Sequence, residues 1–300
     1  MIHDVIIVGG SYAGLSAALQ LARARRQVLV LDAGQRRNRF ASSSHGFLGQ
    51  DGASPGAIAA KARAEVLAYP TVAWYDAMAT DARATPDGFV VKTGADVFRA
   101  KRIILATGVV DELPNVPGLV ERWGKTVFHC PYCHGYELGL GRLGVLATSP
   151  LSSFHAMLVS EWAAPGQMTL FVLEGFELDA DQAAQLTARG IRIEREPVVA
   201  ATGEAPALNV HLRDGRIIPL DGLFAHSHTH LANPFAEQLG CELEAGHSGW
   251  FYKTDAMKET TVPGVFACGD NSVAAGSVAT AVGDGVRAGT AAHRSLVFPR

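Results

Sequence analysis

The first 32 residues carry the pattern that most limits how this chain can fold. An apolar stretch, Val5–Val8, is followed by the glycine turn Gly9–Gly14 and by alanine- and leucine-rich residues 15–25. A second apolar stretch, Val28–Leu31, ends at Asp32. Strand, glycine turn, helix and strand with a terminal acid form the dinucleotide-binding βαβ unit. The pattern therefore predicts a parallel sheet that binds a dinucleotide at its carboxyl edge.

Several residues of this unit have separable tasks. Gly9 permits the tight turn, and Gly14 lets the helix pack closely against the strand. The helix N-terminus offers free N–H groups to a pyrophosphate, and Asp32 would accept hydrogen bonds from an adenosine ribose. The usual second glycine is Ser11 here, which crowds the approach of the backbone to a phosphate. The candidate binding residues are Gly9, Gly10, Ser11, Ala13, Gly14, Asp32 and Ala33.

A second unit of the same type spans residues 143–174, which indicates an internal duplication. Its turn has lost the residues that bind phosphate, because Ala147, Ser149 and Ser152 stand at the glycine positions. Pro150, near the helix start, has no N–H to donate. Glu174 at the strand end would repel the 2′-phosphate of NADPH, and no arginine follows it within a turn. We therefore do not expect NAD(P)H to bind tightly in the second unit.

The order of the remaining segments predicts two domains. A strand near 102–105 ends in Ala106-Thr107-Gly108, and a strand near 265–268 leads into Gly269-Asp270 and a helix over 277–296. Both ends of the chain therefore build the first domain. We expect an α/β fold with two Rossmann-like domains, in which the first is discontinuous and the second is inserted into it. The expected boundaries are 1–112 with 243–300 for the first domain and 113–242 for the second.

The segment Cys130-Pro131-Tyr132-Cys133, with a histidine on each side, is the candidate chemical centre. Two thiols at this spacing can close a disulfide with little movement of the backbone. A structural zinc would need two more ligands, and Cys241 and Cys268 stand alone, so a redox dithiol is favoured over a metal site. His134 is the candidate acid/base because imidazole titrates near neutral pH, and His129 is the weaker candidate.

Composition limits the partners. A net charge of −3 gives no electrostatic reason to bind nucleic acid. No apolar run approaches the length of a bilayer span, and the first residues resemble a strand rather than a signal peptide. We expect a cytoplasmic protein with no membrane partner, and a catalytic dithiol suits that reducing compartment.

Taken together, the motifs resemble the low-molecular-weight thioredoxin reductases and their relatives over essentially the whole chain. They are Gly9–Gly14 with Asp32, Ala106–Gly108, Cys130–Cys133, and Gly269-Asp270 followed by Gly283 and Gly285. The resemblance implies FAD in the first domain, a homodimer, and rotation of one domain against the other during turnover. It adds Thr107, Gly108, Gly269 and Asp270 as candidate FAD ligands. Arg36, Arg37 and Arg39 could reach the FAD phosphates or lie in a solvated loop, and Arg37 is retained as a candidate ligand.

Within this family the chain most resembles the dithiol oxidases of the gliotoxin and holomycin type, which close disulfides in natural products. The features are Cys130–Tyr136, Arg37-Asn38, His45–Leu48 and the turn 147–150 without glycine. Reductases of the NADPH type generally carry an aspartate where His134 stands.

These observations predict exchange of two electrons between FAD and the Cys130/Cys133 pair, with a dithiol as donor and dioxygen as acceptor. By resemblance, Cys130 is the outer sulfur and Cys133 faces the flavin. The partner would be a small-molecule dithiol or disulfide, or a thioredoxin-like protein. The alternatives are an NAD(P)H-dependent disulfide reductase, a reductase that uses ferredoxin or flavodoxin, and a non-catalytic flavoprotein or thiol sensor.

Three further residue groups have simpler interpretations. His226, His228 and His230 alternate, so they would share one face of an extended segment. Because no carboxylate or cysteine accompanies them, a solvated strand edge is favoured over a metal site. Cys241 and Cys268 are expected to be buried packing residues, although Cys268 could lie near the flavin.

Overall fold

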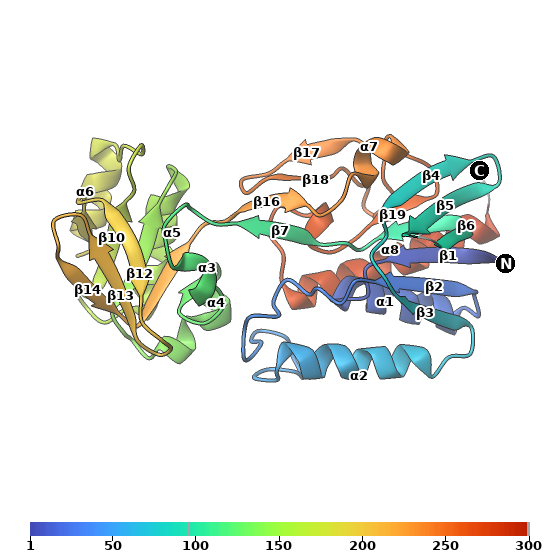
Figure 1. Cartoon of the computed structure of the whole chain (residues 1–300), viewed down its shortest axis with the longest axis horizontal. Helices are drawn as coiled ribbons and strands as arrows, with labels where there is room; N and C mark the ends of the chain where they lie inside the picture. The colour runs from blue at the N-terminus through green and yellow to red at the C-terminus, as the bar shows by residue number, and fades with distance from the viewer. Residues whose placement is uncertain (95, 299–300) are drawn as a thin grey trace.

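The computed structural model describes residues 1–94 and 96–298 and shows two α/β domains joined by a thin two-stranded ribbon (Figure 1). The first domain is built on a seven-stranded sheet of order β3-β2-β1-β6-β5-β4. The first half of β6 pairs with β5, and its second half pairs with β19 along the same edge. The strands are β1 (Ile2–Val8), β2 (Val28–Asp32), β3 (Val72–Asp76), β4 (Asp81–Thr85), β5 (Gly88–Thr93), β6 (Asp96–Leu105) and β19 (Val265–Ala267).

Alternating side chains of β1 divide the core of this domain into two layers. Val5 and Ile7 pack against helices α1 and α8, whereas Ile6 and Val8 pack against α7 and Tyr252. The helices are α1 (Tyr12–Arg23), α2 (Pro55–Leu67), α7 (Phe235–Leu239) and α8 (Val278–Val297), with a 3₁₀ turn η3 (Asp270–Ser272). A short hairpin, β17 (Leu243–Ala245) and β18 (Trp250–Tyr252), covers the second layer.

The second domain contains a five-stranded parallel sheet of order β11-β10-β9-β15-β8 and an antiparallel sheet of order β12-β13-β14. Its strands are β8 (Val127–Phe128), β9 (Leu143–Ala147), β10 (Met168–Val172), β11 (Arg192–Glu194), β12 (Val198–Thr202), β13 (Leu208–Leu212), β14 (Ile217–Leu220) and β15 (Gly222–Ala225). Its helices are α3 (Leu119–Arg122), α4 (Pro131–His134), α5 (Leu151–Val159) and α6 (Ala180–Ala188), with 3₁₀ turns η1 (Tyr136–Leu138) and η2 (Ser160–Trp162). The expected fold of two Rossmann-like domains is thus confirmed.

The ribbon between the domains consists of β7 (Val109–Glu112) and β16 (His228–Leu231), which pair antiparallel. The predicted boundary placed residues 232–242 in the second domain. Phe235 and Leu239 of α7, however, pack in the same hydrophobic cluster as Ile6 of the first sheet. We therefore propose that the second domain ends at β16.

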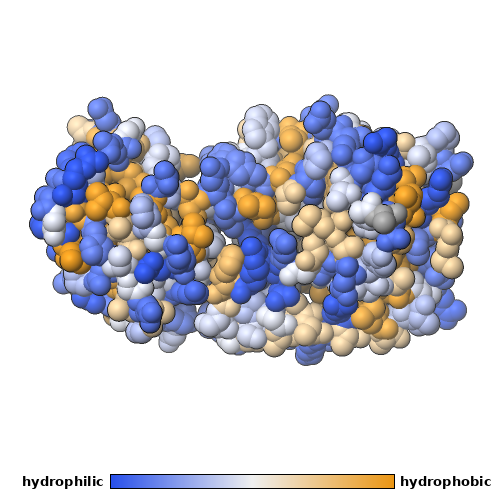
Figure 2. All heavy atoms as spheres, in the orientation of Figure 1, coloured by the Kyte–Doolittle hydropathy of each residue, from blue (hydrophilic) through white to orange (hydrophobic). Residues whose placement is uncertain are grey.

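The space-filling view shows a notch between the two lobes and mainly hydrophilic side chains on the visible face, interrupted by separate hydrophobic patches (Figure 2). Among the described helices, none is both long and apolar enough to cross a bilayer.

Candidate active site between the domains

Two adjoining cavities extend from the first glycine turn to the dithiol. One, of about 350 Å³, lies at Gly9, Gly10 and Asp32. The other, of about 250 Å³, reaches Cys130 and Cys133. Both are lined by Ser11, Arg37 and Thr107, so they form one groove with the dithiol at one end, which suits an extended ligand.

The glycine turn fits closely against the end of β6. Gly9 has a φ of +105°, and a Cβ there would lie 2.2 Å from the carbonyl oxygen of Ala106. A Cβ on Gly14 would lie 1.8 Å from the carbonyl oxygen of Gly9, so α1 starts in contact with the turn. Ser11, the N-cap of α1, makes no side-chain capping bond. The first N–H groups of α1 are therefore left for an anionic ligand, as a dinucleotide pyrophosphate requires.

The predicted binding residues come together, with one exception. The backbone N–H of Gly10 donates to the Asp32 carboxylate over 3.1 Å, which orients this acid at the end of β2. Gly14 lies outside the cavities and serves in packing. The predicted ligands that line the groove are Gly9, Gly10, Ser11, Ala13, Asp32, Ala33, Arg37, Thr107, Gly108, Gly269 and Asp270.

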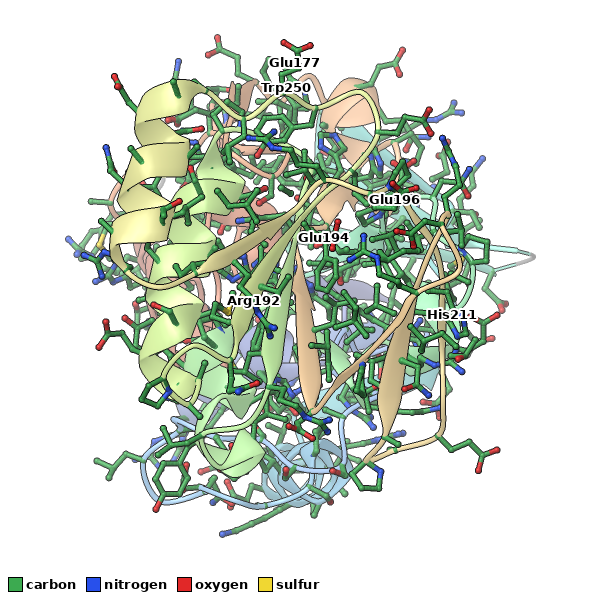
Figure 3. All side chains as sticks on the ribbon, turned by 90° about the vertical axis from the view of Figure 1, so that its left-hand side faces the viewer. Glu177, Arg192, Glu194, Glu196, His211 and Trp250 are labelled. Carbon is green, nitrogen blue, oxygen red and sulfur yellow. The ribbon has the colours of Figure 1, made fainter. Side chains whose placement is uncertain are left out.

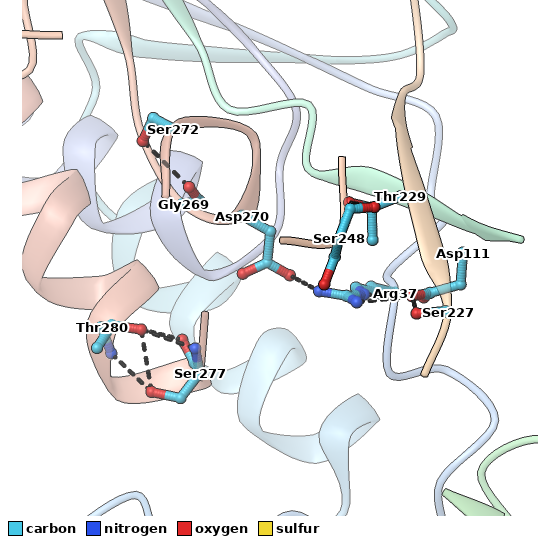
Figure 4. Close-up of polar contacts among 10 residues, drawn as sticks. All are labelled: Arg37, Asp111, Ser227, Thr229, Ser248, Gly269, Asp270, Ser272, Ser277 and Thr280. Carbon is cyan, nitrogen blue, oxygen red and sulfur yellow. Dashed lines mark hydrogen bonds and ion pairs between the residues drawn. The ribbon is translucent and has the colours of Figure 1, made fainter. Parts of the chain in front are cut away.

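Arg37 lies at the centre of a polar network that the sequence did not reveal (Figure 4). Its Nε and Nη2 donate to the two carboxylate oxygens of Asp111 over 2.8 and 2.6 Å, and its Nη1 donates to Asp270 over 2.9 Å. Ser227 donates to Asp111 over 2.7 Å. Burial alone would lower the pKa of Arg37, but the two carboxylates raise it. Burial alone would raise the pKa of Asp111, but Arg37 and Ser227 lower it.

The dithiol sits on the short helix α4, on the side of the second domain that faces the first (Figure 1). Cys133 Sγ donates to Cys130 Sγ over 2.6 Å. This hydrogen bond lowers the pKa of Cys130 to about 7 against the opposing effect of burial, and backbone N–H groups of Cys133 and Tyr132 assist. The hydrogen bond to Cys130 and burial both raise the pKa of Cys133. In the reduced pair Cys130 is therefore the more acidic thiol, and Cys133 keeps its proton to higher pH.

His134 lines the same cavity as the dithiol. Its ring stacks on Phe128, with ring centroids 4.3 Å apart and an interplanar angle of 23°. Burial lowers its pKa, so the imidazole is neutral near pH 7. Both ring nitrogens are buried and lack hydrogen-bond partners of good geometry within the described part of the chain. A weaker contact with the backbone of Cys130 opposes the effect of burial on this pKa, and a neutral imidazole next to the dithiol can accept a proton.

Three histidines, of which His155 is buried and His129 and His226 are half-buried, form a cluster near the dithiol that sequence reasoning missed. The His226 ring lies 5.2 Å from that of His129 and 4.9 Å from that of His155. Burial lowers the pKa of His129 to about 4 and that of His155 to about 3. The sequence held one signal for this cluster: a histidine directly follows each of the strands β8 and β15. Parallel strands bring the residues that follow them to one edge of the sheet.

The alternating histidines therefore do not form one site. His226 points into this cluster, whereas His228 and His230 lie exposed on β16, with ring centroids 4.8 Å apart. His230 also pairs with Glu112 of β7. Within residues 1–94 and 96–298, no group of three potential ligands is arranged to hold a metal ion.

The turn of the second βαβ unit is closed by its own side chain. Ser152 Oγ accepts hydrogen bonds from the backbone N–H groups of Thr148 and Ser149, over 3.1 and 3.3 Å. These are amides that would otherwise be free to face a phosphate at this turn. Glu174 pairs with Arg213 over 2.7 Å, so the fold supplies an arginine that is not near Glu174 in the sequence.

Asn271 stabilises the floor of the groove, and the two remaining cysteines are buried. Asn271 donates from Nδ2 to the carbonyl oxygen of Leu105 and to Thr107 Oγ1, over 3.0 and 3.1 Å. Its place directly after Gly269-Asp270 could have drawn attention to it. Cys268 lines the cavity but is buried, and burial raises its pKa to about 12. Cys241 is also buried.

Two Rossmann-like domains, a dinucleotide groove and a Cys-x-x-Cys pair at its end define a flavin-linked disulfide oxidoreductase. A family model for pyridine nucleotide-disulphide oxidoreductases matches residues 3–158 and 167–285, and the chain belongs to this family. It is an FAD-dependent disulfide oxidoreductase of the thioredoxin reductase-like type, as the sequence predicted.

Similar proteins span the whole chain. Thioredoxin reductase tcpT of Claviceps purpurea is 33% identical, with 99% of this chain and 95% of the relative covered. Thioredoxin reductase sirT of Leptosphaeria maculans is 34% identical, with 96% and 93% covered. The crystal structure of an oxidoreductase from Agrobacterium tumefaciens is 53% identical with a TM-score of 0.95, and the match covers 100% of both chains.

Proposed function

We propose that this protein is a dithiol oxidase, in which the Cys130/Cys133 disulfide oxidises a dithiol substrate and dioxygen is the final acceptor. The observation that carries the proposal is the closed turn of the second domain. Its amides are occupied by Ser152, and Pro150 has no N–H, so a nicotinamide dinucleotide lacks its usual phosphate site. In this proposal electrons enter through the dithiol instead of from a nicotinamide.

The groove fits FAD. The unengaged N–H groups at the start of α1 suit its pyrophosphate, Asp32 suits its ribose, and Cys130 and Cys133 line the far end of the same groove. When bound, FAD would supply a two-electron acceptor for the reduced pair, with dioxygen as the final acceptor. We propose as its ligands Gly9, Gly10, Ser11, Ala13, Asp32, Ala33, Thr107, Gly108, Gly269 and Asp270.

The covalent steps take place on sulfur. A substrate thiolate attacks Cys130 Sγ, breaks the Cys130–Cys133 bond and releases Cys133 as a thiolate. The second substrate thiol, once deprotonated, attacks the substrate sulfur of the mixed disulfide and frees Cys130. The substrate loses two electrons and two protons, and the cysteine pair gains the two electrons. In the reducing direction Cys130 would be the attacking thiolate, because its pKa is the lower of the two. In the oxidising direction the resemblance alone makes Cys130 the sulfur that the substrate attacks.

His134 is the proposed acid/base. It lies in the cavity with the dithiol, is neutral near pH 7, and has a free ring nitrogen that can take the proton of a substrate thiol. The substrate class would be a small-molecule dithiol or a thioredoxin-like protein. Homodimeric assembly and a cytoplasmic location stay predictions.

One observation favours an NAD(P)H-dependent reductase as the second candidate. Arg213 lies beside Glu174 at the end of β10, where it could face the 2′-phosphate that Glu174 alone would repel. A reductase that takes electrons from ferredoxin or flavodoxin would agree with the closed turn as well.

An anaerobic titration separates these functions. The FAD-loaded protein is mixed with NADPH, NADH, reduced ferredoxin and dithiothreitol in separate samples, and the visible absorbance of the flavin is followed. We expect bleaching by dithiothreitol alone, followed by recovery with one equivalent of peroxide when air is admitted. The Cys130→Ser/Cys133→Ser variant is the control and should bleach with none of them. Rapid stoichiometric bleaching by NADPH would make the protein a reductase, and bleaching by reduced ferredoxin alone would identify the other donor.

A further inference from the structure

The two strands that join the domains are both attached to the first domain by side chains. On β7, Asp111 receives the paired hydrogen bonds from Arg37, and on β16, Thr229 binds the carbonyl oxygen of Ser248 through its N–H and its Oγ1, over 2.6 and 3.2 Å (Figure 4). Ser227, next to β16, binds Asp111. The Arg37 network therefore contacts both passages of the chain between the domains.

We infer that Arg37, Asp111 and Ser227 form an interdomain brace that holds the Cys130/Cys133 pair against the flavin end of the groove. In this interpretation Arg37 is a positioning residue and does not bind the FAD phosphates. The inference rests on the proposed exchange between FAD and the dithiol, and it replaces our expectation that Arg37 is a cofactor ligand.

The charges of the network argue against a phosphate ligand. Arg37 is in contact with two carboxylates, those of Asp111 and Asp270, so the group as a whole carries a net negative charge. The Asp111 side chain is only 10% exposed and that of Asp270 20%, so solvent screens this charge weakly. A pyrophosphate would be repelled by the same carboxylates that hold the arginine. The paired geometry to Asp111 instead fixes direction as well as distance, which suits a brace.

Close packing beside the network supports the same orientation of the domains. A Cβ on Gly124, in the turn before β8, would lie 2.9 Å from the Cβ of Phe40 in the first domain. Further along, His45 Nδ1 of the first domain lies 3.4 Å from Glu137 of η1, which follows the dithiol. The loop 37–45 thus contacts the ribbon through Arg37 and the segments on either side of the dithiol through Phe40 and His45.

The test uses Arg37→Gln, Asp111→Asn and Ser227→Ala in the FAD-loaded full-length protein. Arg216→Gln is the matched control, because Arg216 also contacts two carboxylates, Asp214 and Glu194. Glu194 lies on β11, at the end of the second domain far from the ribbon (Figure 3). Three quantities are measured: the Kd of FAD, the radius of gyration in solution, and the anaerobic rate of flavin reduction by dithiothreitol.

We expect Arg37→Gln and Asp111→Asn to keep the FAD Kd within about twofold, to increase the radius of gyration, and to slow flavin reduction about tenfold, because the dithiol is no longer aligned. Ser227→Ala should have a smaller effect of the same kind. The Arg37→Gln/Asp111→Asn double variant should be no slower than the worse single variant, since both remove one interaction. Arg216→Gln should match the wild type in all three.

Two results would overturn the brace. If Arg37→Gln raises the FAD Kd tenfold or more while Asp111→Asn does not, Arg37 is a phosphate ligand. If neither variant changes the radius of gyration or the reduction rate, the network does not position the dithiol. If dithiothreitol fails to reduce the flavin of the wild type, the proposed function fails, and the scattering comparison still decides on the brace.

Discussion

At the scale of single residues, the chemistry depends on how two sulfurs share one proton. The short contact between Cys130 and Cys133 stabilises a thiolate on the first and a thiol on the second. In the reduced pair Cys130 is therefore the stronger acid, whereas its role as the sulfur that reacts with substrate stays a prediction. The sequence showed only that the two cysteines were a pair, and the resemblance supplied their order. The difference between the pKa values of Cys130 and Cys133 depends on the distance between their sulfurs and on nearby backbone N–H groups, which the spacing of the cysteines in the sequence does not give.

Removing Cys133 should therefore weaken Cys130 as a thiolate. In the reduced wild type, we expect the alkylation rate of Cys130 by iodoacetamide to rise with pH around a midpoint of about 7. In Cys133→Ala the hydrogen bond is lost, so the midpoint should move up toward the ordinary thiol value of about 8.5. Mass spectrometry of the labelled peptide measures the rate. An unchanged midpoint would show that the backbone N–H groups alone set the pKa of Cys130.

At the scale of elements, the sequence predicted the parts whose patterns are local. The first βαβ unit, the second βαβ unit and α8 lie within a few residues of their predicted bounds. The sheet β12-β13-β14 and helix α6 were not predicted, because their short strands and half-exposed helix carry weak periodic patterns. The contact of Arg37 with Asp111 joins residues 74 positions apart, so only the fold could reveal it.

Two glycines of α8 provide a test of whether close packing of α8 on α1 is needed for FAD binding. A Cβ on Gly285 would lie 2.2 Å from the carbonyl oxygen of Ala13 in the first turn of α1, whereas a Cβ on Gly283 would meet nothing within 4 Å. Gly285→Ala should therefore push the helices apart, lower stability by about 1–3 kcal/mol and weaken FAD retention.

Gly283→Ala is the control in the same helix and should raise stability by about 0.5–1 kcal/mol, because alanine favours helix. Urea unfolding and the FAD content after gel filtration measure both effects. Equal behaviour of the two variants would show that α8 does not rest on α1 as described.

At the scale of the whole molecule, two histidines of the second domain link stability to pH. The pKa values of His129 and His155 are lowered on folding to about 4 and about 3. In the unfolded chain both bind protons below about pH 6.5, whereas the folded protein does not bind them until lower pH. The stability is therefore fully present above pH 6.5 and is lost as the pH falls from there toward 4.

We expect the unfolding free energy of the wild type to drop by at least about 2 kcal/mol between pH 7.5 and pH 5.0. This drop should be larger than the drop in a variant that lacks one of the two histidines. His155→Leu removes one of the two groups and should reduce the drop, although it lowers stability at pH 7.5. Urea unfolding at the two pH values measures the difference. A drop of equal size in the variant would assign the acid sensitivity to other groups.

The pairing of β7 with β16 has a consequence for how this architecture can be rearranged. Because His228 lies opposite Glu112, the chain leaves the first domain and returns to it at almost the same point. Residues 113–227 are thus a cassette whose two ends meet, and a tight turn after Glu112 could replace them without altering the path of the remaining chain. A flavin-binding domain can in this way exchange one inserted redox domain for another at a single insertion point. Both natural recombination and protein engineering could use this point to give the flavin a new electron donor.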